Sequence, residues 1–318
     1  MIPYITEAEV QKILTEKNSL TLARETFELI AQKKVFMPPK MYLVLSASND
    51  FRAMPAYLES RAGEGACGIK WISVFPQNAA KREPTVNGTI LLNSTETGRL
   101  LAVLEANFIT AMRTAGTAAL AASLMANPQP KIMALVGAGI QADYQLGAHA
   151  DLFHFDEIRV WGFKADEAQN FCRRHPQFKN LKACSEIKAC VEAADVLVTC
   201  TSSREPLVRK EWVKPGAHIN AIGADAKGKE ELDPALLLEA RVVVDEWEQA
   251  SHSGEINVPI ARGLFSREKV YAELSEIVSQ KKKGRLSAKE ITVFDSTGLA
   301  ALDIHFAQFV FDALRPIR

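Results

Sequence analysis

The chain has 318 residues, of which 47% are hydrophobic and 24% charged, and its formal net charge is zero. This length predicts about two domains, because a single core rarely grows beyond roughly 250 to 300 residues. The neutral balance of charge argues against nucleic-acid binding and against electrostatic attachment to a membrane.

The N-terminus and the cysteines indicate the compartment. The first residues, MIPYITEAEVQKIL, lack the basic and then apolar pattern of a signal peptide, and no apolar run approaches the roughly 18 residues of a membrane span. None of the five cysteines lies in a CxxC pair. We therefore expect a cytoplasmic protein with reduced thiols and no metal site.

The first half of the chain changes from a helical pattern to a strand pattern. Residues 4–35 are predicted to be helical, beginning with a capping box in which Thr6 is followed by Glu9. Short strands then alternate with turn formers, and a long helix rich in Ala, Thr and Gly follows until Asn127-Pro128 stops it. The strands are expected at 41–47, 68–75, 88–94 and 99–106, and the helix at 108–126. The small side chains of that helix would let another backbone approach closely, which predicts a buried position.

From residue 131 onward, strands and helices alternate. Strands with continuous apolar runs are expected at 131–136, 157–162, 195–200, 217–223, 241–245 and 291–295. Helices are expected at 140–153, 165–175, 185–193 and 267–280, and a last amphipathic helix at 298–314. Apolar strands alternating with helices indicate a parallel sheet covered on both faces, so we predict a doubly wound α/β domain in this half.

The strand GIKWISVF contains a lysine among branched aliphatic residues. Its alternation places Lys70 on the same face as Ile72 and Val74. Desolvating an unpaired ammonium is costly, so one interpretation is an edge strand whose lysine head reaches water. The other is a desolvated lysine with a lowered pKa, suited to proton transfer or to pairing with a substrate carboxylate.

The stretch GAGIQA, which begins at Gly137, is a G-x-G-x-x-A variant of the dinucleotide-binding fingerprint. Gly137 permits a tight turn after the strand, and Gly139 lets the backbone approach a pyrophosphate. Ala142 keeps the helix close to the strand, and the helix N-terminus offers N–H groups to the anion. Because the motif follows an apolar strand and opens a helix, it predicts a dinucleotide site.

The second strand of this half bears on which dinucleotide is bound. An acid near its end would hold the ribose 2′-hydroxyl of NAD, but this sequence has Trp161-Gly162-Phe163-Lys164 and no carboxylate before Asp166. A missing acid removes repulsion against a 2′-phosphate, and Lys164 could pair with one, so NADPH is favoured over NADH. The alternative is that Lys164 is merely solvated, which leaves dual use open.

With these motifs in place, the sequence resembles the ornithine cyclodeaminase/μ-crystallin family over nearly its whole length. The motifs that carry the resemblance are RAMPAYL (52–58), GIKWISVFPQN (68–78), AMRTAGTAALAA (111–122), VGAGIQA (136–142), IGADAKGKEELDP (222–234), GEI (254–256) and FDSTGLAALDI (294–304). The resemblance implies an α+β substrate-binding and dimerisation domain made of residues 1–118 with 300–318. It also implies a Rossmann dinucleotide-binding domain at residues 119–299, and a homodimer.

The resemblance also implies roles for individual residues. Lys70 matches the active-site lysine of the family, Arg113 the arginine that grips the substrate carboxylate, and Arg52 a second carboxylate contact. Asp225 matches an acid that faces the substrate's amino groups. The positions expected to contact the dinucleotide, from the fingerprint and the resemblance together, are Thr114, Gly137, Gly139, Ile140, Gln141, Ala142, Lys164, Thr201, Ser296 and Gly298.

The expected chemistry is hydride exchange between a nicotinamide and the Cα of a small α-amino or α-imino acid. The carboxylate would be held by Arg113, Lys70 and Arg52, and the imine would be protonated by Lys70 or Asp225. The motifs favour an alanine dehydrogenase or a cyclic ketimine reductase. Cyclodeaminases of the family tend to carry VNGHP after their lysine, where this chain has SVFP, so ornithine or lysine cyclodeamination is the second reading. A non-catalytic NADPH binder is the third.

Overall fold

The structure is a computed structural model that describes residues 1–46, 48–59, 65–81, 83–164 and 166–315. Positions 47, 165 and 316–318, which belong to predicted elements or domains, lie outside the described residues. The chain folds as two units, which are Met1–Gly116 with Leu299–Arg318 (unit 1) and Thr117–Gly298 (unit 2). The first boundary falls inside a helix, and the last helix belongs to unit 1.

Unit 1 is built on a mixed sheet. Its strands are β1 (Tyr4–Ile5), β2 (Val35–Phe36), β3 (Met41–Val44), β4 (Asp50–Leu58), β5 (Ala66–Val74), β6 (Val86–Asn93) and β7 (Leu100–Glu105). They follow the order β1-β7-β6-β5-β4-β2, and β3 also pairs with β4. Its helices are α1 (Glu7–Val10), α2 (Glu16–Ala31), the 3-10 helix η1 (Pro76–Lys81), the first part of α3 (Asn107–Met125) and α11 (Ala300–Leu314).

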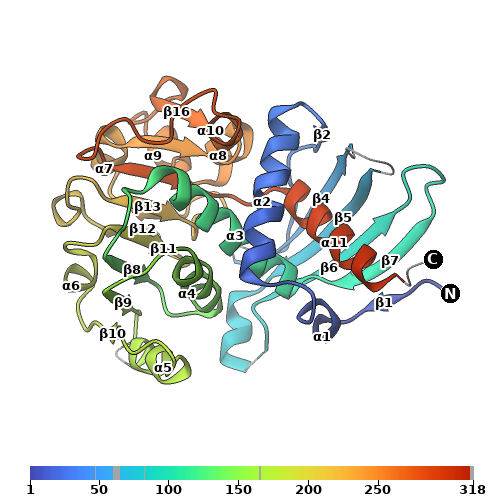
Figure 1. The fold of residues 1–318 in the computed structure, drawn as a ribbon, viewed down its shortest axis with the longest axis horizontal. Helices are drawn as coiled ribbons and strands as arrows, with labels where there is room; N and C mark the ends of the chain where they lie inside the picture. Colours follow the sequence, from blue (N-terminus) through green and yellow to red (C-terminus); the bar gives the residue numbers. More distant parts are fainter. Residues whose placement is uncertain (47, 60–64, 82, 165, 316–318) are drawn as a thin grey trace. The chain divides into compact units, whose positions relative to one another are not determined.

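Helix α11 packs on β4, β5 and β6, and α2 packs against α11 (Figure 1). The prediction of helix over 4–35 is correct for α1 and α2, and the Thr6–Glu9 capping box is present. It is wrong at both ends, where β1 pairs with β7 and β2 pairs with β4. The ladder hydrogen bonds that neighbouring strands offer there outweigh the local helical pattern.

Helix α3 corrects the expectation that no apolar run approaches the length of a membrane span. It is 19 residues long with a mean hydropathy of 1.2, enough to cross a membrane by length and composition. However, 78% of it is buried inside the fold, which is typical of a core helix. Its small residues permit close packing, because a Cβ on Gly116 would lie 2.7 Å from the carbonyl oxygen of Ser19 on α2.

Unit 2 is a doubly wound α/β domain, which confirms the predicted fold class. Its main sheet has eight parallel strands in the order β10-β9-β8-β11-β13-β17-β15-β16. These are β8 (Ile132–Val136), β9 (Glu157–Trp161), β10 (Leu181–Ala183), β11 (Val196–Thr199), β13 (His218–Ala221), β15 (Arg241–Val244), β16 (Val270–Glu273) and β17 (Thr292–Asp295). A separate pair is formed by β12 (Arg204–Val208) and β14 (Glu230–Leu232).

Helices connect these strands. They are α4 (Ile140–Leu152), α5 (Glu167–Arg174), α6 (Ile187–Val191), α7 (Pro234–Glu239), α8 (Trp247–Ser253), α9 (Asn257–Ala261) and α10 (Leu274–Val278), with 3-10 helices η2 (Lys210–Trp212) and η3 (Arg267–Lys269). The side chains of β8 alternate between two different apolar clusters. Ala134 and Val136 pack in one cluster, and Met133 and Leu135 pack in the other. Both faces of the sheet are therefore buried.

One predicted element of unit 2 is wrong. The helix expected at 267–280 is the 3-10 helix η3, then strand β16, then the short helix α10. Residues 270–273 instead pair with β15 at the end of the sheet. A two-turn apolar pattern cannot distinguish a short edge strand from a helix, because the deciding contact is with a distant strand.

Two buried histidines form a polar network inside unit 2. Nδ1 of His149 contacts the carbonyl oxygen of Gln145 at 2.8 Å, and its Nε2 contacts Nδ2 of Asn220 at 3.0 Å. Nε2 of His218 contacts Oδ1 of Asn220 at 3.1 Å, and its Nδ1 contacts Oγ1 of Thr292 at 2.9 Å. Burial lowers the pKa of His149 to about 4 and that of His218 to about 3. Both rings are therefore neutral in the folded protein at neutral pH.

This network predicts loss of stability in acid. Below the unfolded-state pKa of 6.5 the unfolded chain binds protons at His149 and His218, whereas the folded chain does not until about pH 4. The free energy of unfolding, measured in urea between pH 7 and pH 5, should fall by up to about 1.4 kcal/mol per pH unit for each histidine. His149→Gln should reduce that slope, and His252→Gln, at an exposed histidine, should not. Equal slopes in all three proteins would contradict the assignment.

Candidate active site

Lys70 lies in the interior of the unit 1 sheet. Its strand, β5, is flanked by β4 and β6, and the residue opposite it on β4 is Met54. Only 1% of Lys70 is exposed to solvent. The interpretation as an edge-strand lysine with its head in water is therefore wrong, and that of a desolvated lysine is confirmed.

The ammonium of Lys70 is paired with a buried carboxylate that sequence reasoning did not single out. Nζ of Lys70 lies 2.7 Å from Oδ2 of Asp303 on α11. Oδ1 of Asp303 accepts a hydrogen bond of 2.9 Å from Nε of Arg113 on α3. Both Lys70 and Asp303 are almost completely buried, and Arg113 is 6% exposed. One buried carboxylate thus faces two cationic side chains.

The burial of this cluster changes the proton affinity of Lys70. The pKa of Lys70 is lowered from 10.5 to about 7, mainly by desolvation and also by the nearby Arg113 and Lys40, while Asp303 opposes the decrease. A pKa near 7 means that protonated and neutral Lys70 are both populated at neutral pH. Such a group can donate or accept a proton under physiological conditions.

Arg52 lies on the same face of the sheet as Lys70. Arg52 is opposite Ile72, and Met54, two residues further along β4, is opposite Lys70, so Arg52 and Lys70 are diagonal neighbours. Nε of Arg52 lies 2.7 Å from Oδ1 of Asp50, and its guanidinium lies 5.3 Å from the ring centre of Tyr42. Asp50 therefore orients Arg52 and balances its charge. Thr114 follows Arg113 on α3, and its hydroxyl donates to the carbonyl of Thr110.

The glycine-rich turn of unit 2 has the geometry that its sequence predicts. Gly137 has a φ of +117°, and a Cβ there would lie 2.9 Å from the carbonyl oxygen of Cys200. Gly139 is the N-cap of α4, and a Cβ there would meet no atom within 4 Å. Nε2 of Gln141 is buried without a hydrogen-bond partner among the described residues. Ala142 is fully buried and Ile140 exposed. Open space at a helix N-terminus with an unpaired donor fits a dinucleotide pyrophosphate.

The other predicted residues of unit 2 follow the carboxyl ends of parallel strands. Thr201 follows β11, Asp225 follows β13, and Ser296 and Gly298 follow β17. Oδ1 of Asp225 forms an ion pair of 2.5 Å with Nζ of Lys229, a residue that sequence reasoning did not single out. In open α/β sheets this edge is where ligands bind.

The environment of Lys164 differs from the expectation. Lys164 is exposed, but its backbone N–H donates to Oε2 of Glu167 at 3.2 Å. The same Oε2 would lie 2.9 Å from a Cβ on Gly162 at the end of β9. A carboxylate therefore does lie beside the end of the second strand, because Glu167 at the start of α5 folds back toward it. Sequence spacing alone missed this acid.

The predicted site residues are divided between the two units. Lys70, Arg52, Arg113 and Thr114 belong to unit 1, and the others belong to unit 2. Among the described residues, no group of three or more His, Cys, Asp or Glu side chains could hold a metal ion.

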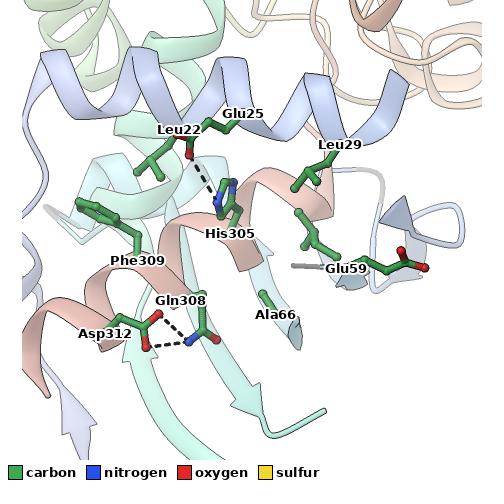
Figure 2. A pocket seen from close by; sticks show the side chains of 10 residues that line it. Leu22, Glu25, Leu29, Glu59, Ala66, His305, Gln308, Phe309 and Asp312 are labelled. Atoms are coloured by element: carbon green, nitrogen blue, oxygen red, sulfur yellow. Dashed lines mark hydrogen bonds and ion pairs between the residues drawn. The ribbon is translucent and has the colours of Figure 1, made fainter. Parts of the chain in front are cut away.

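A separate groove of about 320 Å³ in unit 1 lies between α2 and α11 and holds none of the predicted site residues. Figure 2 shows Glu25 on α2 pointing toward His305 on α11 in this groove, with 3.9 Å between Oε2 of Glu25 and Nε2 of His305.

Comparisons with known proteins agree over nearly the full length. The sequence model of the ornithine cyclodeaminase/mu-crystallin family matches residues 4–316. An alanine dehydrogenase from Archaeoglobus fulgidus is 40% identical over 311 residues, which cover 97% of this chain and 94% of the relative. A solved structure described as an archaeal alanine dehydrogenase dimer with bound NAD is 39% identical, with a TM-score of 0.92 over 98% of this chain and 95% of that one. Delta(1)-pyrroline-2-carboxylate reductase from Thermococcus litoralis, solved with NADH and L-proline, is 30% identical, with a TM-score of 0.94 over 98% and 97%.

The buried cluster predicts a specific loss of stability when its carboxylate is neutralised. Asp303→Asn should lower the free energy of unfolding by about 3 to 5 kcal/mol, because Lys70 and Arg113 each lose a buried carboxylate as partner. The loss should be larger at pH 6 than at pH 8, since Lys70 gives up its proton at the higher pH. The control is Asp312→Asn, an exposed position on the same helix, which should cost less than about 0.5 kcal/mol. Equal losses in urea unfolding would contradict the pairing.

Proposed function

Because this chain belongs to the ornithine cyclodeaminase/mu-crystallin family, we propose that it is an NAD(P)H-dependent oxidoreductase acting at the Cα of a small α-amino or α-imino acid. The observation that carries this proposal is the buried cluster of Lys70, Arg113 and Asp303. The relatives named above act on this class of compound: one is an alanine dehydrogenase and another a pyrroline-2-carboxylate reductase.

Unit 1 is proposed to hold the substrate by its carboxylate. Lys70 and Arg113 both face Asp303, and a substrate carboxylate would give these two cations a further anionic partner. A planar guanidinium can hold a carboxylate by parallel hydrogen bonds, and the low local dielectric strengthens the attraction. Arg52, oriented by Asp50 on the same face, is a second candidate contact.

Proton transfer is proposed for Lys70 and Asp225. An imine accepts hydride more readily when its nitrogen is protonated, and a lysine with a pKa of about 7 can supply that proton at neutral pH. Asp225, paired with Lys229, is the corresponding group of unit 2. The nicotinamide supplies or accepts the hydride when the dinucleotide is bound.

The dinucleotide is proposed to bind at the glycine turn of unit 2. Its pyrophosphate would lie against Gly139 at the start of α4, where space for it is open. Solved relatives hold NAD or NADH. The preference for NADPH rests on Lys164 and stays a prediction. The carboxylate of Glu167 beside the end of β9 counts against it, because an acid at this position favours an unphosphorylated ribose.

A spectrophotometric assay tests the function. Purified protein should oxidise NADH or NADPH when given pyruvate with ammonia, or a cyclic five- or six-membered imino acid. Lys70→Ala and Arg113→Ala should reduce turnover by at least about a thousandfold while leaving dinucleotide binding nearly intact, because both lie in unit 1. Conversion of ornithine to proline without net change in cofactor would instead favour a cyclodeaminase. Binding of NADPH without turnover of any of these compounds would indicate a binding protein.

The glycine turn gives a graded test of cofactor binding. Gly139→Ala and Gly139→Val should fold normally, because a Cβ at this position meets no protein atom within 4 Å. Each added carbon should weaken NADH binding by occupying the space of the pyrophosphate, by about tenfold for Ala and more for Val. Isothermal titration calorimetry measures the affinity, and circular dichroism checks the fold. Unchanged affinity in Gly139→Val would contradict the proposed phosphate site.

A homodimer is proposed through the face of the unit 1 sheet opposite Lys70. Trp71 and Leu91 lie on this face and are 41% and 37% exposed, and Phe51 stacks on Trp71 with ring centres 5.2 Å apart. Apolar side chains grouped on an exposed sheet face are a candidate for an interface. The occupant is proposed to be a second copy of the chain, since the archaeal relative was solved as a dimer.

Disrupting this face should change the oligomeric state. Trp71→Glu should shift the protein from dimer to monomer in light scattering after size exclusion, because a charge would be buried at the interface. Leu238→Glu, at an exposed apolar residue on α7 of unit 2, is the matched control and should remain dimeric. A dimer that survives Trp71→Glu would place the interface elsewhere.

A further inference from the structure

The carboxylate of Glu231 accepts four hydrogen bonds from the ends of two strands and the residues that follow them. Oε1 accepts from the backbone N–H of Thr201 and from its hydroxyl, each at 2.7 Å. Oε2 accepts from the hydroxyl of Thr199 at 2.7 Å and from the backbone N–H of Gly223 at 2.8 Å. Glu231 is completely buried. All four donors are neutral, so the carboxylate satisfies buried polar groups rather than an ion pair.

Thr199 is the last residue of β11 and Thr201 lies in the segment that follows that strand, whereas Gly223 lies in the segment that follows the adjacent strand β13. The two segments are in direct contact, because a Cβ on Gly223 would lie only 2.1 Å from the carbonyl oxygen of Thr201 and 2.6 Å from Oε1 of Glu231. Asp225 follows two residues later and donates its N–H to the carbonyl of Gly223 at 3.1 Å. Glu231 therefore lies where the segment of Thr201 meets the segment of Asp225.

Glu231 is itself held by other buried acids. The backbone N–H groups of Glu231 and Leu232 donate to Oε1 of Glu255, at 2.8 and 2.6 Å. The backbone N–H groups of Glu255 and Ile256 donate to Asp295 at the end of β17, at 2.9 and 3.2 Å. This series of carboxylates runs from the end of β17, next to Ser296, to the segments after β11 and β13.

From this geometry we infer that Glu231 is a positioning residue for the proposed reaction, fixing Thr201 for the dinucleotide and the segment of Asp225 for proton transfer. The inference rests on the proposed function. Glu231 is completely buried, so it would act through the two segments that it joins rather than by contact with a ligand.

A carboxylate is required at this position, since its two oxygens each accept a backbone N–H from a different segment. In Glu231→Gln, one of these oxygens becomes an NH2 group that faces a backbone donor. The hydroxyls of Thr199 and Thr201 can rotate to avoid the new NH2 group, but a backbone N–H cannot. The N–H of either Thr201 or Gly223 is therefore left without its acceptor. A buried donor without a partner is costly, so that segment should shift.

The matched control is the neighbouring Glu230. It is also fully buried on β14, but its Oε2 lies 3.3 Å from Nη1 of Arg262, and among the described residues its side chain makes no hydrogen bond to either segment. Glu231→Gln and Glu230→Gln are compared in NADH affinity by calorimetry and in steady-state kinetics with the best imino acid, well below both melting temperatures. Thr199→Val, which removes one hydroxyl donor and keeps the side-chain shape, is the milder second variant.

The expected result is that Glu231→Gln lowers kcat and weakens NADH binding by about tenfold or more each, whereas the KM for the imino acid changes little. Thr199→Val should change kcat and NADH affinity in the same direction by a smaller factor, and Glu230→Gln by less than about twofold. A lower melting temperature with unchanged kcat and NADH affinity in Glu231→Gln would overturn the inference. So would an unfolded Glu231→Gln protein combined with a Thr199→Val protein indistinguishable from wild type.

Failure of the proposed function has a different signature. A wild-type protein that binds no NADH overturns the proposed function, and the inference with it. If the wild type binds NADH but turns over none of the imino acids, the inference about Glu231 is tested by NADH affinity alone. Equal affinity in the Glu231→Gln and Glu230→Gln proteins overturns the inference. Weaker binding in Glu231→Gln alone supports it.

Discussion

The pairing of Lys70 and Arg113 with one buried carboxylate, Asp303, is the interaction on which the proposed chemistry depends. Burial makes the ammonium costly and lowers its pKa to about 7, and Asp303 keeps it from losing its proton altogether. In the proposed function, a substrate carboxylate is a further anionic partner for these two cations. The same arrangement would then serve both anion recognition and proton exchange at neutral pH.

Unit 2 uses buried carboxylates in a different way. Glu231, Glu255 and Asp295 accept hydrogen bonds mainly from backbone N–H groups and hydroxyls, and these bonds fix the segments at the carboxyl edge of the parallel sheet. Loops at that edge carry the function of doubly wound domains, although loops are also the more mobile parts of a fold. Buried carboxylates can hold such loops in place from inside the fold, which leaves the surface of the loops open to a ligand.

Much of this organisation could be predicted from the sequence. The family, the fold class, the six apolar strands of unit 2 and the turn at Gly137 follow from local patterns and are confirmed. Asp303 was not identified, although a carboxylate in the apolar helix AALDIHF is a signal of a buried ion pair. Strand order is not a local property, so the interior position of Lys70, the edge strand at 270–273 and the contacts of Glu231 required the tertiary structure.

The most direct test of the central claim is the titration of Lys70 itself. Lysine side chains labelled with 13C at Cε report their protonation by NMR, and Lys70→Arg identifies the Lys70 signal by its disappearance. We expect a midpoint near pH 7, against the ordinary lysine pKa of 10.5. A midpoint near 10.5 would show that the ammonium is solvated and would contradict the buried cluster as the basis of substrate binding and proton transfer.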